Sequence, residues 1–200
     1  MTNAGSQAAG LWDAQAATFD DEADHGLRDP DTKEAWRALL DTALPAGPSR
    51  IIDLGCGTGS LAVLLAEEGH DVVGMDFSPR MVDAARAKSV RAGVSACFLV
   101  GDVSAPNLES AAYDVVLCRH VLWALPNPAD ALRSWSTLLA PGGRMILVEG
   151  SWSTGGGLTA AEGERLVRTC REDVTVLPLT DPLLWGGPIT DERYLLLSRR

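Results

Sequence analysis

Short apolar runs alternate with amphipathic stretches along most of the chain. The runs, such as Val115-Val116-Leu117, are nearly continuous, which is typical of strands buried on both faces of a parallel sheet. The predicted strands are 50–54, 71–76, 96–100, 113–118 and 144–149, and helices are predicted over 60–68, 79–92 and 128–140. Repeated strand–helix–strand units predict a doubly wound α/β fold, a three-layer sandwich with helices on both faces of a mostly parallel sheet.

Further helices are predicted before this pattern. The apolar residues at helical spacing in the first of them are Leu11, Trp12, Ala16 and Phe19. An acidic stretch follows over 20–26, which we expect to be a loop. Asp29 and Pro30 are typical of a helix start, and they predict a second helix that ends before Pro45.

The segment after residue 150 predicts one more helix and two strands. Thr159 and Glu162 have the spacing of a capping box, which predicts a helix over 159–171. Apolar runs over 174–179 and 193–198 predict a closing hairpin, with 180–191 as its long loop.

Charge and composition narrow the possible partners. The net charge of −10 and the lack of a Lys/Arg cluster disfavour nucleic acid and anionic membranes as partners. The polar start of the chain predicts no signal peptide, and no apolar run approaches the ~20 residues that would span a bilayer. The four cysteines have no CxxC spacing and lie in or beside apolar runs, so we expect buried free thiols and a cytoplasmic location.

A glycine-rich turn follows the first predicted strand of the α/β pattern. In the run 51–60, glycines stand at Gly55, Gly57 and Gly59, between a strand and a helix, where the backbone can approach a ligand closely. Asp76 ends the next strand, 21 residues after Gly55, and its carboxylate can accept hydrogen bonds from ribose hydroxyls. This arrangement fits either a nicotinamide dinucleotide or S-adenosylmethionine.

The carboxylate of Asp53 favours S-adenosylmethionine. Asp53 lies two residues before the first glycine, where it would repel the diphosphate of a dinucleotide. S-adenosylmethionine has no phosphate and carries an ammonium group, which Asp53 can hold directly or through water. The glycines also follow a GxGxG spacing, whereas dinucleotide-binding folds have GxGxxG.

Three further residues are candidates for the adenine end of the cofactor. Asp102 follows the third strand and can accept a hydrogen bond from the adenine amino group, or it can cap the next turn. Phe77 and Met81 can pack on the purine, although Met81 can equally be a core residue of its helix.

Taken together, these segments strongly resemble the class I methyltransferases that use S-adenosylmethionine. The similar segments are the run 51–86, Gly101-Asp102-Val103, Tyr113 to His120 and Leu139 to Arg144. The resemblance implies a seven-stranded sheet with an antiparallel last strand. It implies cofactor contacts from Cys56 in the glycine loop, from Val103, and from Cys118 and Arg119 after the fourth strand. Arg119 can alternatively seal the strand end.

The N-terminal segment is similar to the cap of many small-molecule methyltransferases. We therefore expect residues 1–45 to be a helical cap or lid of the same domain, with Trp12 against the cofactor, and residues 46–200 to be the core. Trp36, Trp123 and Trp152 can wall an aromatic pocket with Trp12, or belong to the core. Trp185, in the 180–191 loop, can cover the site or contact another subunit.

Candidates for catalysis lie at the carboxyl ends of the strands, where ligands bind in open α/β sheets. His120 is a candidate base or a residue that hydrogen-bonds near the cofactor; His25 can close over the acceptor or be an exposed loop residue. Glu149 is a candidate base, or a side chain that binds an amine of the acceptor, or a solvated carboxylate at the strand end. His70 is expected to be structural. Methyl transfer needs no metal, and no His/Cys cluster has ligand spacing, so we expect no metal site.

The sequence therefore predicts a methyltransferase that moves a methyl group in line from S-adenosylmethionine to O, N or C of a small-molecule acceptor. A small acceptor is expected because the core takes up most of the chain, and we expect a monomer or homodimer. A nicotinamide-dependent oxidoreductase and a non-catalytic, S-adenosylmethionine-binding partner subunit are the alternatives.

Overall fold

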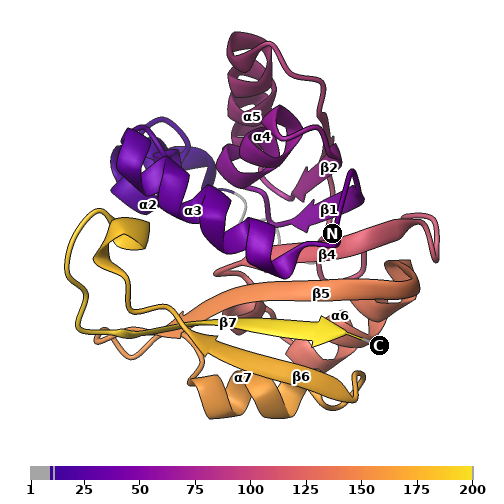
Figure 1. The fold of residues 1–200 in the computed structure, drawn as a ribbon. Coiled ribbons are helices and arrows are strands. Elements are labelled where there is room, and N and C mark those ends of the chain that lie inside the picture. Colours follow the sequence, from indigo (N-terminus) through magenta and orange to yellow (C-terminus); the bar gives the residue numbers. More distant parts are fainter. Residues whose placement is uncertain (1–9, 11, 200) are drawn as a thin grey trace.

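A seven-stranded sheet forms the centre of the computed structural model, which describes residues 10 and 12–199 (Figure 1). The strands lie in the order β3-β2-β1-β4-β5-β7-β6. Their bounds are β1 Arg50–Leu54, β2 Asp71–Asp76, β3 Cys97–Val100, β4 Tyr113–Arg119, β5 Leu139–Ser151, β6 Asp173–Pro178 and β7 Glu192–Arg199. The last strand, β7, runs antiparallel to β5 and β6, and the other neighbouring pairs are parallel. The predicted fold class is confirmed.

Helices cover both faces of the sheet (Figure 1). On one face lie α3 (Pro30–Ala43), α4 (Ser60–Glu67) and α5 (Pro79–Ala92); on the other lie α6 (Pro128–Leu138) and α7 (Ala160–Val167). Neighbouring residues of one strand enter different cores: Ile51 packs with α4, and Ile52 packs with α6 and its buried Trp135. This alternation explains the continuous apolar runs, since both faces of each strand are buried.

The N-terminal segment differs from its prediction. Residues 12–15 are helical, but the helix does not reach Phe19, because a turn over 16–18 leads into the 3-10 helix η1 (Phe19–Asp21). The acidic stretch is not a loop, since it contains the short helix α2 (Ala23–Gly26). The Asp29 side chain caps α3 as predicted, at 2.9 Å from the Thr32 N–H. Leu11 and residues 1–9, including the start used for the signal-peptide prediction, lie outside the described residues.

Three element boundaries also differ. Helix α6 ends at Leu138, because β5 begins at once and runs through Pro141-Gly142-Gly143, with a register shift against β4. Helix α7 ends at Val167, and turns over 168–170 replace its expected last turn. The closing hairpin is confirmed, and its long loop contains the 3-10 helix η3 (Pro182–Trp185).

The cysteines are free, but they are not all buried. Cys56 and Cys118 are buried and Cys170 is half-buried, whereas Cys97 is exposed at the start of the edge strand β3. His70 accepts a hydrogen bond through Nδ1 from the Ser49 N–H at 3.1 Å, in line with its structural role. Within the described residues, no helix is both long and apolar enough to cross a membrane.

Candidate functional site

The glycine loop between β1 and α4 has the tight geometry that its sequence predicts. Gly55, Gly57 and Gly59 have φ values of 77°, 52° and 78°, in the left-handed region that favours glycine. A Cβ atom on Gly55 would lie 2.3 Å from Cγ2 of Val121, and one on Gly59 would lie 2.7 Å from Cβ of Ala85. Glycine is therefore required here by backbone conformation and by space.

The carboxylate of Asp76 holds this loop in shape. Its Oδ2 atom accepts the Gly57 N–H and its Oδ1 atom accepts the Ser78 N–H, each at 2.9 Å. Burial raises the pKa of Asp76, and these backbone hydrogen bonds oppose the rise. Because each carboxylate oxygen has two lone pairs, both can still accept a hydrogen bond from a bound ligand.

Asp53 lies beside Asp76 at the end of β1 and is only 3% exposed. Burial raises its pKa to about 7; the nearby Arg119 guanidinium opposes this rise, and the Asp76 carboxylate adds to it. Asp53 therefore has a real cost of ionisation that a bound cation would relieve. The sequence correctly predicted that the two carboxylates would meet at this loop.

The adenine-end candidates have different surroundings. Asp102 is exposed, and its Oδ1 accepts the N–H and the hydroxyl of Ser104 at 2.8 and 2.7 Å, so it caps the next turn. Met81 is a fully buried core residue of α5, and Phe77 is half-buried. The Val103 side chain lies in the core on the α6 face, while its carbonyl accepts the indole N–H of Trp135 at 2.7 Å.

Cys56, Cys118 and Arg119 lie around the same strand ends. Burial raises the pKa of both thiols well above its ordinary value, so neither is an activated nucleophile. The Arg119 guanidinium donates to the backbone carbonyl of Asp24 and lies 5.0 Å above the ring of Trp36. Arg119 thus ties the cap to the strand end through its side chain.

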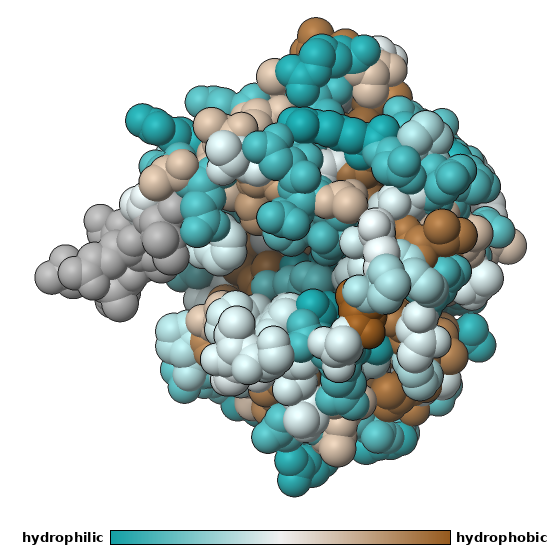
Figure 2. Space-filling model, turned by 90° about the vertical axis from the view of Figure 1, so that its left-hand side faces the viewer, coloured by the Kyte–Doolittle hydropathy of each residue, from teal (hydrophilic) through white to brown (hydrophobic). Residues whose placement is uncertain are grey.

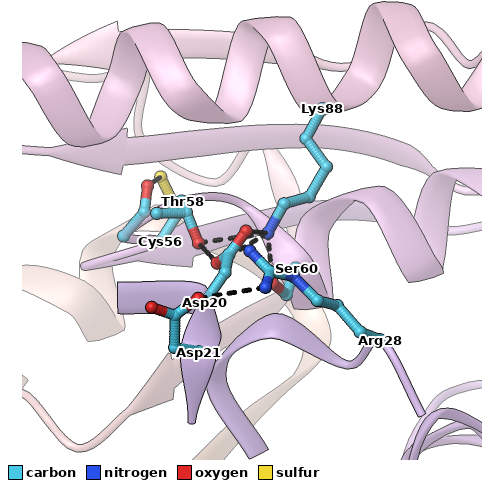
Figure 3. A network of polar contacts seen from close by, with 8 residues as sticks. Asp20, Asp21, Arg28, Cys56, Thr58, Ser60 and Lys88 are labelled. Carbon is cyan, nitrogen blue, oxygen red and sulfur yellow. Dashed lines mark hydrogen bonds and ion pairs between the residues drawn. The ribbon is translucent and has the colours of Figure 1, made fainter. Parts of the chain in front are cut away.

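An ion pair near the glycine loop fastens the cap, by which we mean residues 12–28, to the core (Figure 3). The Lys88 ammonium lies 2.9 Å from Oδ2 of Asp20 and 3.1 Å from the Thr58 hydroxyl, and it also donates to the Ser60 hydroxyl. Thr58 in turn donates to Asp20. The sequence does not point to these residues, because nothing in the spacing of Lys88 distinguishes it from a solvated lysine.

Aromatic contacts place the cap directly over the loop. The Phe19 ring lies 3.3 Å from the position that a Cβ atom on Gly57 would take, and it stacks on His25 with centroids 4.2 Å apart. Trp12 meets Phe19 edge to face at 6.1 Å. Asp13 accepts from the Ser78 hydroxyl and from the Arg80 N–H at the start of α5. Trp12 therefore lies over the loop within the cap.

His25 and His120 meet where the cap closes on β4. One donor atom from each, together with a carboxylate oxygen of Asp24, lies within 4.8 Å of the others. His120 has a φ of 58°, a strained value for this residue type, and its N–H donates to the Val148 carbonyl at 2.8 Å. Burial lowers the pKa of both histidines, and Arg119 and Arg193 lower that of His120 further. His25 is therefore not an exposed loop residue.

Tryptophans surround His120. Its ring stacks on Trp185 at 5.9 Å and meets Trp152 edge to face at 5.3 Å, while Trp123 lies 5.2 Å from Trp152. Trp36 is not part of this wall, because it is fully buried and its indole N–H donates to the Leu184 carbonyl at 2.8 Å. Figure 2 looks onto the end of the sheet where the parallel strands finish, and it shows a depression with both hydrophobic and hydrophilic residues in it.

The burial of Glu149 excludes one of its three sequence-based alternatives. Glu149 is fully buried, so it is not a solvated carboxylate, and its Oε1 accepts the backbone N–H groups of Val121 and Leu122 at 3.1 and 2.8 Å. Burial raises its pKa to about 8. Through these two hydrogen bonds, Glu149 holds in place the backbone that follows His120.

Comparison with known proteins agrees with this geometry. Residues 52–147 match the family model described as "Methyltransferase domain". A demethylmenaquinone methyltransferase of Thermus thermophilus is 40% identical over 120 residues, covering 57% of this chain and 53% of the relative. A ubiquinone biosynthesis O-methyltransferase of Xanthomonas axonopodis pv. citri is 36% identical over 104 residues, covering 52% and 43%. The chain thus spans about half the length of the curated relatives it matches.

A solved structure extends the likeness of fold. The S-adenosylmethionine-dependent methyltransferase from Mesorhizobium loti superposes with a TM-score of 0.66 at 19% identity, covering 82% of this chain and 97% of the other. With the matching domain over residues 52–147, the glycine loop and the sheet order, these findings show that the chain is similar to the class I, Rossmann-like S-adenosylmethionine-dependent methyltransferases.

Proposed function

We propose that this protein transfers a methyl group from S-adenosylmethionine to a small-molecule acceptor. The observation that carries the proposal is the pair of buried carboxylates, Asp53 and Asp76, at the glycine loop. A diphosphate at this position would meet the carboxylate of Asp53, whereas a nucleoside with an ammonium group would relieve the cost of ionising Asp53. The remaining lone pairs of Asp76 fit ribose hydroxyls.

Different residues around the glycine loop would bind different parts of S-adenosylmethionine. Asp53 would hold the ammonium, Asp76 the ribose, and the backbone around Gly55, Cys56, Gly57 and Gly59 the amino-acid end. Phe77 and Val103 with Asp102 would border the adenine, and Cys118 and Arg119 would close the pocket between β1 and β4. When bound, S-adenosylmethionine supplies a methyl group on a sulfonium, which needs no further activation as an electrophile.

His120 and His25 act on the acceptor side. Their lowered pKa values keep both imidazoles neutral at neutral pH, so each can accept a proton from an acceptor hydroxyl or amine. Glu149 acts as a positioning residue, since it holds the backbone of Val121 and Leu122 that follows His120. The proposal therefore assigns proton transfer to His120 or His25 and assigns no direct chemistry to Glu149.

The acceptor is proposed to be neutral and aromatic, methylated at O, N or C. Trp152, Trp185 and Trp123 offer flat apolar surfaces beside His120, which suit a planar ring. Two relatives bear names from ubiquinone biosynthesis and menaquinone chemistry, and quinone precursors have such rings. We further propose that residues 1–45 act as a lid, and that the enzyme works in the cytoplasm as a monomer or homodimer.

Calorimetry with S-adenosylhomocysteine, S-adenosylmethionine and NADH tests the cofactor. We expect both nucleosides to bind and NADH not to bind; tight binding of NADH alone would replace the proposal with an oxidoreductase. Transfer of a labelled methyl group into a pool of small aromatic hydroxy compounds tests the reaction. Nucleoside binding without transfer to any acceptor pool would instead indicate a non-catalytic partner subunit.

The variant His120→Ala tests the acceptor side separately. Loss of a base lowers turnover, while the cofactor contacts at Asp53 and Asp76 stay in place, so kcat should fall more than affinity for S-adenosylhomocysteine. Equal losses in both would assign His120 to cofactor binding. His70→Ala, at the opposite end of the sheet, is the matched control and should change neither.

A further inference from the structure

Two unpartnered histidine nitrogens are buried at the junction between the cap and the core. Nδ1 of His25 and Nε2 of His120 are inaccessible to solvent and have no hydrogen-bond partner among the described residues. A buried polar atom without a partner costs about 1–3 kcal/mol, so two of them in one place require an explanation. The two imidazoles lie together, so this junction favours a ligand that the two histidines share.

A carboxylate completes a set of three donors. Asp24 precedes His25 in α2, and its Oδ2 atom lies 3.8 Å from Nε2 of His25. One donor atom from each of Asp24, His25 and His120 lies within 4.8 Å of the other two. Ligands on a tetrahedral zinc ion are about 3.4 Å apart when each bond is about 2.1 Å, so small side-chain rotations would bring these donors into place.

We propose that Asp24, His25 and His120 bind a divalent transition-metal ion of the zinc class, which clasps the cap to the core. Imidazole nitrogen with one carboxylate oxygen is a donor set that suits zinc and its neighbours and does not suit magnesium or calcium. Three protein ligands leave one position open, as in catalytic zinc sites. A water molecule or an acceptor oxygen would take that position, and His120 itself lies against Trp152 and Trp185.

The charges around the site permit such an ion. Neutral imidazoles are the form that binds metal, and burial lowers the pKa of both histidines. Arg119 and Arg193 are the opposing cations, but Asp53 lies near Arg119, and the Arg193 guanidinium is 3.3 Å from a carboxylate oxygen of Asp191. Both positive charges are thus partly neutralised before the ion enters.

Metal binding and proton uptake at His120 exclude each other, because an imidazole nitrogen that holds an ion cannot accept a proton. A bound ion would therefore replace the proposed histidine base and leave methyl transfer itself in place, and metal binding can be measured without any acceptor or cofactor. In the loaded form, the ion would lower the pKa of a coordinated acceptor hydroxyl and replace the histidines as the means of removing its proton.

Titration of metal-free protein with Co²⁺, followed by visible absorption, and with Zn²⁺ by calorimetry tests the site. We expect one ion per chain, and His25→Ala or His120→Ala should weaken binding at least about tenfold, since even outer-shell changes cost that much. Asp24→Asn should weaken it while leaving the backbone carbonyl to Arg119. His70→Ala, which removes the remaining histidine, should have no effect.

A second readout concerns the cap. Zn²⁺ should slow proteolysis of residues 12–28 in the wild type and have no such effect in His25→Ala, whose fold is checked by metal-free thermal unfolding. Unchanged Zn²⁺ affinity in both histidine variants, an equal loss in His70→Ala, or no binding by the wild type would overturn the proposal. Each of these outcomes leaves the calorimetric test of S-adenosylhomocysteine binding untouched.

Discussion

Lys88 and Asp20 form an ion pair 2.9 Å long between the core and the cap, and their side chains are only 15% and 18% exposed. Removing one partner leaves the other charge partly buried and without its counterion. The unfolding free energy lost in this way should lie between the small value for an exposed ion pair and the large value for a buried ion pair. The pair is therefore expected to fasten the cap in solution.

Lys88→Met tests this fastening. We expect the variant to lose about 1–3 kcal/mol of unfolding free energy in urea and to be cut faster within residues 12–28 by protease. Asp83→Ala breaks the exposed pair with Arg86 on the same helix and should change neither measurement. If Lys88→Met matched the wild type in both, the ion pair would have no role in holding the cap.

Asp53 predicts how cofactor affinity depends on pH. Its pKa is raised to about 7 in the free protein, and a bound ammonium would favour the ionised form. Affinity for S-adenosylhomocysteine should thus be constant above pH 7 and fall below it, by at most about tenfold per pH unit. Asp53→Asn should bind more weakly and lose this dependence between pH 6 and 7. A wild-type affinity that does not change over this range would remove Asp53 from the ammonium site.

Asp76 has two roles that one pair of variants can separate. Asp76→Ala removes the acceptor of the Gly57 and Ser78 N–H groups, so both stability and affinity for S-adenosylhomocysteine should fall, the latter by about 1–3 kcal/mol. Asp76→Asn keeps one acceptor oxygen and should recover part of the stability. Asp114→Asn is the matched control, because Asp114 also accepts a backbone N–H, from Arg50 at 2.8 Å, at the opposite end of the sheet. Unchanged affinity in both Asp76 variants would withdraw the ribose assignment.

Glu149 predicts a loss of stability as pH rises. Its pKa is raised from 4.5 to about 8, so between these values the folded protein binds a proton that the unfolded chain releases. The contribution of this group to the unfolding free energy should be complete below pH 4.5 and lost by about pH 8. Between these values, the unfolding free energy should fall by about 1.4 kcal/mol per pH unit at most. Glu149→Gln keeps an oxygen for Val121 and Leu122 and should reduce the decline, measured by urea unfolding at pH 5 to 8. A parallel decline in the variant would show that Glu149 is already ionised without cost.

The parts of the fold that local pattern determines were predictable. The glycines, Asp53 and Asp76 lie where a strand, a turn and a helix must bring them, so their meeting follows from topology alone. The end of the first helix at Gln15 and the short helix α2 were not predictable. Both belong to the cap, whose contacts are with Ser78, Lys88 and Arg119 of the core.

The candidate catalytic residues show the same limit. The sequence put His120 and Glu149 at neighbouring strand ends, but which one faces the acceptor depends on burial, and burial is a property of the assembled layers. Nothing in the sequence relates His25 to His120, which are far apart along the chain and meet only in the folded protein. The periodicity of apolar positions predicts local helices and strands, and it does not predict long-range contacts of this kind.

The hydrogen bond from the Trp36 indole to the Leu184 carbonyl joins positions 148 residues apart. The ribosome releases α2 and α3 long before it synthesises η3. The Trp36 side chain therefore stays exposed, or packs elsewhere, until the hairpin of β6 and β7 has formed. The tryptophan side of the pocket is therefore complete only after η3 has been synthesised, and chains released before η3 would carry an incomplete one.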